Sequence, residues 1–498
     1  MGDAPGGGTG KRRTAAGRSG TTRADTGSAS TDTGSASTDT AGLTAGLRVR
    51  DPRVPAPTPP PRPSAPARRH LLRTGAALAV GAASAPLLAG CAPSEADSVG
   101  ADGRITVEMW HGQADTGRKA IQSLVDDFNR RQSRIRVDAG GGGVVADAML
   151  QKVTAALAAG SYPDIALIFG ADLARVARSP RVVDLTDTLR DTPYWPRFWG
   201  SVREAVTLNG KVRAAPAVLD TLCVVYNRKL FRQAGVPYPR PGWTWDDFIR
   251  TARLLTDPGR GTFGTGWPGT GDEDTVWRLW PLVWDLGGEV IAPDGHSIGF
   301  RDVGERALGT LARLAADKSV YVDPKPGSEQ MHQVFIGGRM GMMATGPWEL
   351  PDIVAGEVDY DVVAPPTYSG RPCTISGPDT WTVFDNGPAR SRAAVEFLRW
   401  LGDPAQDVRW AVNGGSLPLS TASARRPEWR RYEGRTTGLP VFTTALSTAR
   451  VRPVHPAYPQ ISQAVGEAIV AVLLGRRSPA EALRTCAEKA DAALLIPR

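Results

Sequence analysis

Hydrophobic and polar positions follow two alternating patterns in the part of the chain after residue 104. Residues 105–110 alternate apolar and polar side chains, as half-buried strands do, whereas 119–129 repeats apolar residues at helical spacing. The succession continues with a strand expected at 135–138, a helix at 146–159 and a nearly all-apolar strand at 164–169. Strand, helix, strand, helix, strand is typical of a parallel sheet covered by helices. The sequence therefore predicts an α/β fold.

The same alternation continues to the end of the chain. The 408 residues from Cys91 to Arg498 are enough for two domains with sizeable cores. Further strands are expected at 212–227 and 341–344, and further helices at 245–256, 303–318, 389–401 and 461–474.

The first 66 residues have no core-forming pattern. Asp25–Thr31 is repeated at Asp32–Thr38, and Pro55–Pro66 is rich in proline. Such a segment buries too little apolar surface to offset its ordering entropy, so we expect residues 1–66 to be disordered. An export leader rarely begins this deep in a chain, which suggests a start codon further downstream, near Val49 or Val54.

Residues 67–90 have the features of an export signal. Arg68 and Arg69 form a pair typical of twin-arginine (Tat) leaders, although the pair leaves the general secretory route open. The apolar run that follows ends in a lipobox, Leu88-Ala89-Gly90-Cys91, whose cysteine thiol can accept a diacylglycerol. The alternative, a membrane-spanning anchor, requires a longer and more apolar run. We expect a lipoprotein signal peptide at 67–90, a tether at 91–103, and an extracytoplasmic protein lipid-anchored to the cell membrane at Cys91.

The positive charge of the chain belongs to its first segment. Residues 1–90 contain 12 Lys and Arg against 5 Asp and Glu, whereas the rest contains 47 basic and 46 acidic residues. A nucleic-acid-binding protein concentrates positive charge on its folded domain, so we exclude that class of partner. Lipidation of Cys91 leaves Cys223, Cys373 and Cys486, of which at most two can pair. Cys223 lies in an apolar run and is expected to be a buried free thiol.

Several separated motifs resemble one protein family in both order and spacing. They are AALAAGSYPDIALI (155–168), VVYNRKLFRQAGVP (224–237), GWTWDDFIRTARLLTD (242–257), FIGGRMGMMATGPW (335–348), AAVEFLRWLGDPAQ (393–406) and NGGSLP (413–418). The chain from Ile105 to about Leu494 resembles family 1 of the extracellular solute-binding proteins of ABC importers, the carbohydrate-binding, maltose-binding-protein-like group.

The resemblance implies a two-lobed, periplasmic-binding-protein-like (type II) α/β fold with a hinge and an interlobe cleft. The hinge crossings are expected near Val218–Leu222, near Ile375–Trp381 and within 425–435. The lobes expected from these crossings are 104–219 with 378–427, and 222–376 with 430–498. Ligands of such sheets bind at the carboxyl ends of the strands.

The function implied is that of a monomeric, non-enzymatic protein without cofactor or metal. It would bind a mono- or oligosaccharide or a polyol and present it to the transmembrane permease subunits of an ABC importer. Three alternatives remain open: a sugar sensor partner, a glycerol-3-phosphate-binding protein, which would need Arg or Lys in the cleft, and a secreted glycosidase. A glycosidase needs two carboxyl groups about 5–9.5 Å apart. Asp220 and Asp379 are its candidates.

Sugar recognition needs flat aromatic faces and planar polar groups that span neighbouring hydroxyls. The chain has 14 Trp against 9 Tyr and 11 Phe. In the family, an aromatic residue of the GPW motif stacks on sugar, which assigns that role to Trp348; the alternative is a tryptophan that packs the hinge. Asp220 stands where maltose-binding protein carries a sugar-binding glutamate. A carboxylate in so apolar a segment is costly unless it faces the cleft or a hinge cation.

The other candidate ligand-binding residues are less distinctive. Trp277, Trp280 and Trp284 are spaced for one face of one helix, which is usually a core stripe, but Trp277 matches a stacking position of the family and Trp280 a buried one. The remaining candidates are His111 and Gln113 in the first loop, Asp172 after the third strand, whose alternative role is a helix N-cap, and Asp379 and Trp381 at the second crossing.

Several patterns carry no chemistry of their own. Gly140–Gly143 lacks the GK[ST] sequence of a phosphate-binding loop, and the five histidines show no metal-ligand spacing. Asp272-Glu273-Asp274 is interpreted as a polar loop. No nucleophile motif occurs, so no catalytic residue is assigned.

Overall fold

The computed structural model describes residues 99–113, 115–140 and 146–496. All of them belong to one compact unit, Leu87–Arg498. The disordered segment, the signal peptide and the lipidated Cys91 fall outside the described residues and stay predictions. Most of the glycine run at 140–143 also falls outside them.

A five-stranded sheet forms the centre of one half of this unit. Its order is β2 (Ile135–Gly140), β1 (Ile105–Trp110), β3 (Ile165–Phe169), β13 (Asp379–Val383) and β6 (Ala215–Val218). β1, β2 and β3 run parallel, whereas β13 is antiparallel to both of its neighbours.

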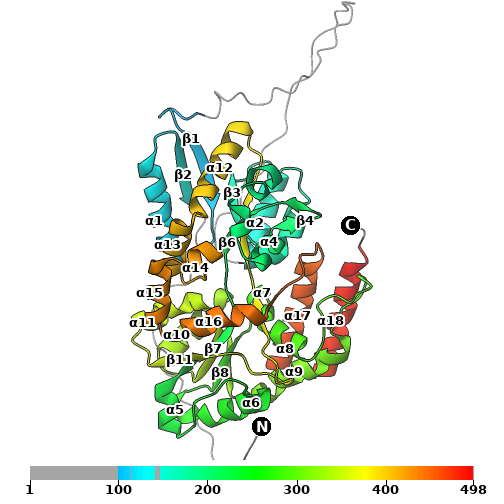
Figure 1. Ribbon diagram of the computed structural model, residues 1–498. Coiled ribbons are helices and arrows are strands. Elements are labelled where there is room, and N and C mark those ends of the chain that lie inside the picture. The colour runs from blue at the N-terminus through cyan, green and yellow to red at the C-terminus, as the bar shows by residue number, and fades with distance from the viewer. Residues whose placement is uncertain (1–98, 114, 141–145, 497–498) are drawn as a thin grey trace, which may run out of the picture. The chain divides into compact units, whose positions relative to one another are not determined.

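Helices cover both faces of this sheet because β3 is apolar on both. Ile165 and Leu167 pack with α1 (Asp115–Arg131) and α12 (Pro388–Leu401), and Ala166 and Ile168 pack with α2 (Ala146–Ala159). α13 (Pro404–Gly414) packs along α1. We call this sheet, with α1, α2, α3 (Leu173–Val176), α12 and α13, the first lobe (Figure 1).

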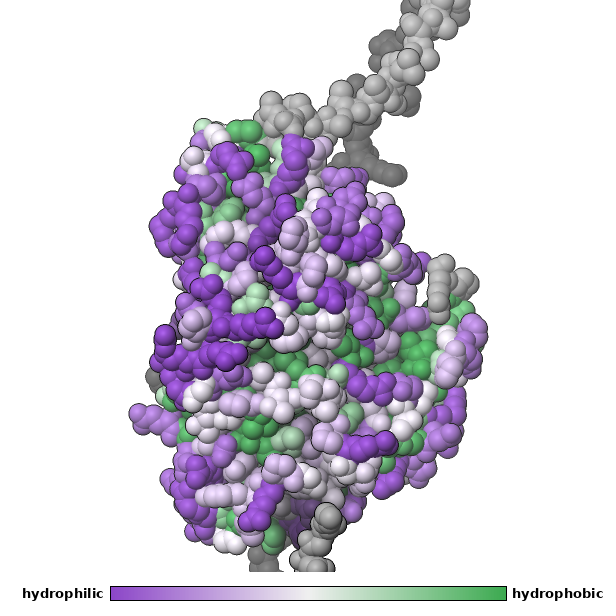
Figure 2. Space-filling model, in the orientation of Figure 1, coloured by the Kyte–Doolittle hydropathy of each residue, from purple (hydrophilic) through white to green (hydrophobic). Residues whose placement is uncertain are grey.

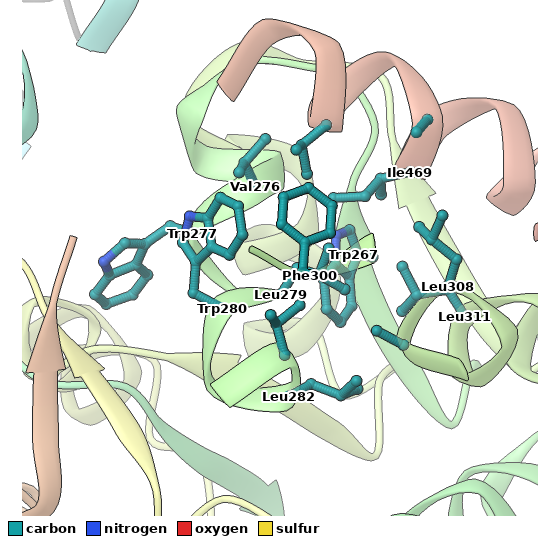
Figure 3. Close-up of a cluster of buried hydrophobic side chains, with 14 of the residues drawn as sticks. Trp267, Val276, Trp277, Leu279, Trp280, Leu282, Phe300, Leu308, Leu311 and Ile469 are labelled. Carbon is teal, nitrogen blue, oxygen red and sulfur yellow. The ribbon is translucent and has the colours of Figure 1, made fainter. Parts of the chain in front are cut away.

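The second lobe is built around a smaller, antiparallel sheet. Its central strand β7 (Cys223–Asn227) lies between β10 (Met342–Thr345) and β11 (Tyr360–Val363). Its hydrophobic core draws on α6 (Trp245–Leu255), α9 (Arg301–Ala316), α17 (Tyr458–Leu473) and α18 (Pro479–Leu494). Figure 3 shows part of this core, where Trp267, Trp280 and Phe300 lie among leucines of α9 and Ile469 of α17.

The chain passes between the lobes three times. Residues 219–222 link β6 to β7, and residues 377–378 link β12 (Thr374–Ser376) to β13. The chain returns to the second lobe between α13 and α17, and after α13 the N–H of Leu417 donates to the carbonyl of Leu219 in the first crossing, at 2.7 Å. Most of the range expected for this third crossing, 425–435, is a helix, α15 (Pro427–Arg435). The lobe boundaries given by the sequence remain a prediction.

The other elements are short. Short strands are β4 (Thr207–Leu208), β5 (Lys211–Val212), β8 (Thr265–Pro268), β9 (Val320–Asp323) and β14 (Ala449–Val451). Short α-helices are α3 (Leu173–Val176), α4 (Gly200–Ala205), α5 (Arg228–Ala234), α7 (Glu273–Trp277), α8 (Trp280–Asp285), α10 (Glu329–Ile336), α11 (Leu350–Ala355), α14 (Thr421–Ala424) and α16 (Leu439–Ala445). Single 3-10 or π turns are η2 (Gly170–Asp172), η3 (Thr186–Arg190), η4 (Trp195–Arg197), η5 (Pro258–Arg260), η6 (Pro326–Ser328), η7 (Pro347–Glu349) and η8 (Leu446–Thr448).

The predicted α/β class is confirmed, but two local predictions were wrong. The stretch from Trp277 to Trp284 is not one helix. Pro281 has no N–H to donate to the carbonyl of Trp277, and the helix is interrupted between α7 and α8. Residues 272–274 are not a loop either. The Asp272 side chain accepts a hydrogen bond from the N–H of Thr275 and so caps α7, which places Glu273 and Asp274 in its first turn.

The face shown in Figure 2 is largely hydrophilic, and the cysteines of the described residues are free. Figure 2 shows hydrophilic residues over much of the face seen in Figure 1, with smaller hydrophobic patches between them. Within the described part of the chain, every helix is too short or too polar to cross a membrane. Cys223, Cys373 and Cys486 are free thiols, and Cys223 is buried as predicted.

Candidate functional site

A cavity of about 230 Å³ lies between the two lobes. The first lobe contributes Gln113, just after β1, and Phe169, the last residue of β3. Both lie at or just beyond the carboxyl end of a parallel strand, where ligands of α/β sheets bind. The second lobe contributes Trp277 and Trp348, and the connecting segments contribute Asp220 and Gly377.

Aromatic side chains from both lobes form part of the wall. Trp277 ends α7, and Trp348 is held in the η7 turn after β10, with their ring centroids 5.6 Å apart and their planes 47° apart. Trp410 on α13 faces the cavity from the first lobe. Aromatic faces of this kind suit the apolar C–H face of a sugar ring.

Buried polar groups at the cavity lack a hydrogen-bond partner in the protein. The indole N–H groups of Trp277 and Trp410, Nε2 of His332, the hydroxyl of Ser416 and Nε of Arg452 have no hydrogen-bond partner among the described residues. Buried polar groups in proteins are rarely left unsatisfied. A ligand with several hydrogen-bonding oxygens would satisfy them.

Two carboxyl groups face the same space under unusual electrostatic conditions. Oδ1 of Asp220 accepts the N–H of Gly377 at 2.8 Å. Burial raises the pKa of Asp220 to about 6, although that hydrogen bond and the Arg452 charge act in the opposite direction. Burial, followed by the charges of Asp220 and Asp172, raises the pKa of Asp379 well above its usual value.

Arg452 belongs to a buried network on the second-lobe side of the cavity. Its Nη1 lies 2.5 Å from Oε1 of Glu273. The same carboxylate accepts hydrogen bonds from Tyr458, at 2.9 Å, and from Ser462. Burial alone would lower the pKa of Arg452, and Glu273 more than offsets this, so the guanidinium stays charged. Trp280 donates to Tyr458 at 2.9 Å and ties the network to the core.

Two glycines allow the walls to come close together. A Cβ on Gly377 would lie 2.7 Å from Nη2 of Arg452 and 3.3 Å from Nε1 of Trp277. Gly415 has φ +75°, and a Cβ there would lie 2.5 Å from Cα of Trp348. Gly415 follows α13 of the first lobe and Trp348 belongs to the second, so this contact joins the two lobes.

We therefore expect Gly415→Ala to weaken ligand binding by about tenfold or more, because the added methyl group opposes closure. The left-handed backbone alone costs an alanine roughly 1–2 kcal/mol, whether or not the lobes are closed. A second glycine with the same backbone geometry therefore serves as a control. Gly235 also ends a helix with left-handed geometry, at φ +66°, but has open space around it. Calorimetric titration should show weaker binding for Gly415→Ala and unchanged binding for Gly235→Ala. Equal affinities in the two variants would contradict the closure contact.

The structure brings five of the eight predicted ligand-binding residues to the cavity. These are Trp348, Asp220, Trp277, Gln113 and Asp379.

The other three lie behind its walls. His111 is buried, and its Nδ1 accepts the N–H of Gln113 at 3.0 Å, so it orients the loop that reaches the cavity. Burial, with a smaller effect of Arg118, lowers the pKa of His111, which favours this neutral acceptor form. Asp172 is buried on η2, and its side chain does not cap α3. Trp381 is 2% exposed and packs in the first-lobe core.

Sequence reasoning missed several cavity residues. Asp272, Glu273 and Asp274 form the acidic run that was interpreted as a loop. Acidic residues are common at the start of a helix, and this pattern could have indicated α7. The NGGSLP motif was noted for resemblance only, yet it brings Gly414, Gly415 and Ser416 to the cavity. Arg452, His332 and Trp410 carried no local signal. Among the described residues, no group of three His, Cys, Asp or Glu side chains is arranged to hold a metal ion.

The chain is similar to a known protein family and to individual proteins of known sequence. Residues 114–408 match the sequence profile of a family described as bacterial extracellular solute-binding protein. A protein of Brucella abortus (strain 2308) that carries the name of a binding protein is 27% identical over 358 residues, which cover 70% of this chain and 84% of that protein.

A second relative and a solved structure differ in what their names say they bind. The sn-glycerol-3-phosphate-binding periplasmic protein of Pectobacterium atrosepticum is 21% identical over 460 residues, covering 86% of this chain and 97% of the relative. The cyclic alpha-maltosyl-1,6-maltose binding protein of Arthrobacter globiformis has a similar structure, with a TM-score of 0.65 and 25% identity over 79% of this chain and 99% of the other.

Proposed function

The chain belongs to the bacterial extracellular solute-binding protein family, and from this membership we propose that it captures a carbohydrate for an ABC importer. It is a binding protein, not an enzyme, and it works outside the cytoplasm. The proposed cargo is a mono- or oligosaccharide or a polyol. Its proposed partners are the permease subunits of the importer. The protein would be a monomer, anchored to the membrane by a lipid on Cys91.

One observation carries the carbohydrate assignment: a single interlobe cavity combines tryptophan faces, unsatisfied donors and carboxyl acceptors. A sugar hydroxyl both donates and accepts, so one hydroxyl can bond to a carboxyl oxygen and accept from an indole N–H. The C–H face of the same ring can lie on Trp348 or Trp277. A purely apolar ligand would leave the donors unsatisfied.

The charges of the cavity favour a neutral sugar over a phosphate ester. Five carboxyl groups line it, those of Asp220, Asp272, Glu273, Asp274 and Asp379. The lining has one arginine, Arg452, which is bound to Glu273. Inside this cavity, the cation that glycerol-3-phosphate would need is therefore already paired.

Closure of the lobes explains how binding is reported to the permease. A ligand that touches Gln113 and Asp379 of the first lobe and Trp348 of the second gains contacts only when the lobes are together. Its binding therefore shifts the hinge equilibrium towards the closed form.

Thermal unfolding against a panel of sugars tests this proposal, with glycerol-3-phosphate included. A sugar that binds the folded protein should raise the unfolding midpoint, with about 2.7 kcal/mol of stabilisation at a hundred times its dissociation constant. Trp348→Ala should abolish the shift, because a stacking face is lost. Trp195→Ala is the matched control, since Trp195 is half-buried in η4 away from the cavity. A shift with glycerol-3-phosphate alone, or one that survives in Trp348→Ala, would contradict the assignment.

A further inference from the structure

We propose that the ligand is an acidic oligosaccharide: one sugar unit occupies the interlobe cavity, and an anionic group further along the chain binds a basic groove beside it. This inference rests on the proposed carbohydrate function. A cavity of about 230 Å³ is smaller than the roughly 300–1,000 Å³ of most small-molecule sites. It holds one ring, so a longer ligand must leave it.

The groove is a second, more open cavity of about 1160 Å³ between the lobes. Its walls come from α2 and α3 of the first lobe and from α17 and α18 of the second. Figure 1 shows α2 in the upper half of the view and α17 and α18 at the lower right.

One continuous stretch of chain joins the groove to the inner cavity. Residues 270–272 line the groove, and residues 272–274 line the cavity, so that Asp272 belongs to both. The cap hydrogen bond from Thr275 holds the Asp272 side chain at this junction. A chain of sugars that leaves the inner cavity past Asp272 therefore enters the groove.

The groove offers different chemistry from the cavity. Its lining contains no aromatic side chain, so it lacks the stacking faces that hold neutral sugars. It offers instead the amides of Gln151, Gln460 and Gln463 and the cations of Arg175, Arg476, Arg477 and Lys489.

Most of this positive charge is not balanced within the groove. Lys489 is ion-paired with Glu467. The three arginines remain, against the single carboxylate of Asp272. Guanidinium groups bind carboxylate, sulfate and phosphate oxygens with two parallel hydrogen bonds, and bonds of this kind are stronger than neutral ones.

Hydrogen bonds fix the side chain of Arg175 and the main chain of Arg476 and Arg477. In the orientation of the Gln460 amide that gives both its groups a partner, its oxygen on α17 accepts from Nη1 of Arg175 at 2.9 Å, which joins the two lobes across the groove. The backbone N–H groups of Arg476 and Arg477 both donate to the carbonyl of Ala471, at 2.8 and 3.3 Å, while their side chains are exposed. An anion there would meet the guanidinium groups of two adjacent residues.

A glycan array tests the inference, because it presents neutral, uronate-containing, sulfated and phosphorylated sugars to the purified protein together. We expect binding to acidic oligosaccharides. Comparing the uronate-containing, sulfated and phosphorylated sugars identifies which anionic group the protein binds. In the double variant R476Q/R477Q, calorimetry should show about tenfold or weaker binding of the acidic glycan and a weaker dependence on salt. The matched control is R430Q/R431Q, two exposed arginines of α15 outside both cavities, with unchanged affinity expected.

Three outcomes would overturn the proposal. Binding to neutral glycans only, or an acidic glycan held equally well by R476Q/R477Q, would remove the groove from ligand binding and leave the proposed function standing. Loss of uptake in R476Q/R477Q at unchanged glycan affinity would assign the arginines to permease docking instead. An array on which no glycan binds would overturn the proposed function, and this inference with it.

Discussion

Glu273→Leu is expected to lower the free energy of unfolding by about 3–5 kcal/mol, the cost of breaking a buried ion pair by removing one partner. The side chain of Arg452 is only 5% exposed and that of Glu273 8%, so water cannot replace the lost carboxylate. Leucine also removes the acceptor of Tyr458 and Ser462. The guanidinium would then stay buried without its partner.

Urea unfolding monitored by tryptophan fluorescence measures this loss. The double variant Glu273→Leu/Arg452→Met should recover much of it, because replacing both charges by apolar side chains leaves no buried charge uncompensated. The control is Glu289→Leu. Its partner Arg450 lies 2.7 Å away in an ion pair that is about half exposed, and such pairs contribute about 1 kcal/mol or less. Equal losses for Glu273→Leu and Glu289→Leu would mean that the buried pair does not stabilise the second lobe.

Local periodicity was sufficient to predict most of the regular structure. The strand at 105–110 and the helix at 146–159 have the predicted bounds, because each has an apolar pattern that only one element type can bury. The break between α7 and α8 was missed although Pro281 marks it. The helical spacing of the tryptophans from 277 to 284 led to the prediction of one continuous helix instead.

The site was predictable where a motif or a strand end marked it. Trp348 and Asp220 stand in such positions, and both line the cavity. Arg452 could not be found this way, because its partner Glu273 is 179 residues away in the sequence. Trp381, by contrast, was predicted at the site but does not line the cavity. Asp379 begins β13 and reaches the cavity, whereas Trp381, two residues deeper in the strand, packs in the core.

Asp220→Asn is expected to make the protein more stable at neutral pH while weakening its ligand binding. The folded protein holds the Asp220 proton more tightly than the unfolded chain does, since its pKa is raised from 3.8 to about 6. The stability that this proton contributes is present below about pH 4 and is lost as the pH rises through 6. The difference between the two pKa values is worth about 3 kcal/mol. An amide, which never ionises, avoids that loss but is a poorer acceptor for a sugar hydroxyl.

Unfolding experiments at pH 4, 6 and 7.5 test the sign. The variant should exceed the parent by up to about 3 kcal/mol at pH 7.5, and the gap should narrow towards pH 4. A variant that is less stable than the parent at every pH would show that Arg452 attracts the carboxylate more strongly than burial opposes it. Calorimetry with the sugar found by the panel measures the accompanying loss of affinity.

The neighbouring carboxyl group sharpens this prediction. The charge of Asp220 is one cause of the raised pKa of Asp379, after burial. Each Asn substitution therefore removes part of the destabilisation that the other would remove, and the double variant Asp220→Asn/Asp379→Asn should gain less stability at pH 7.5 than the sum of the single variants. Strict additivity would mean that the two carboxyl groups do not interact. The cavity would then hold two independently buried acids rather than one coupled pair, each destabilising the fold in return for ligand contact.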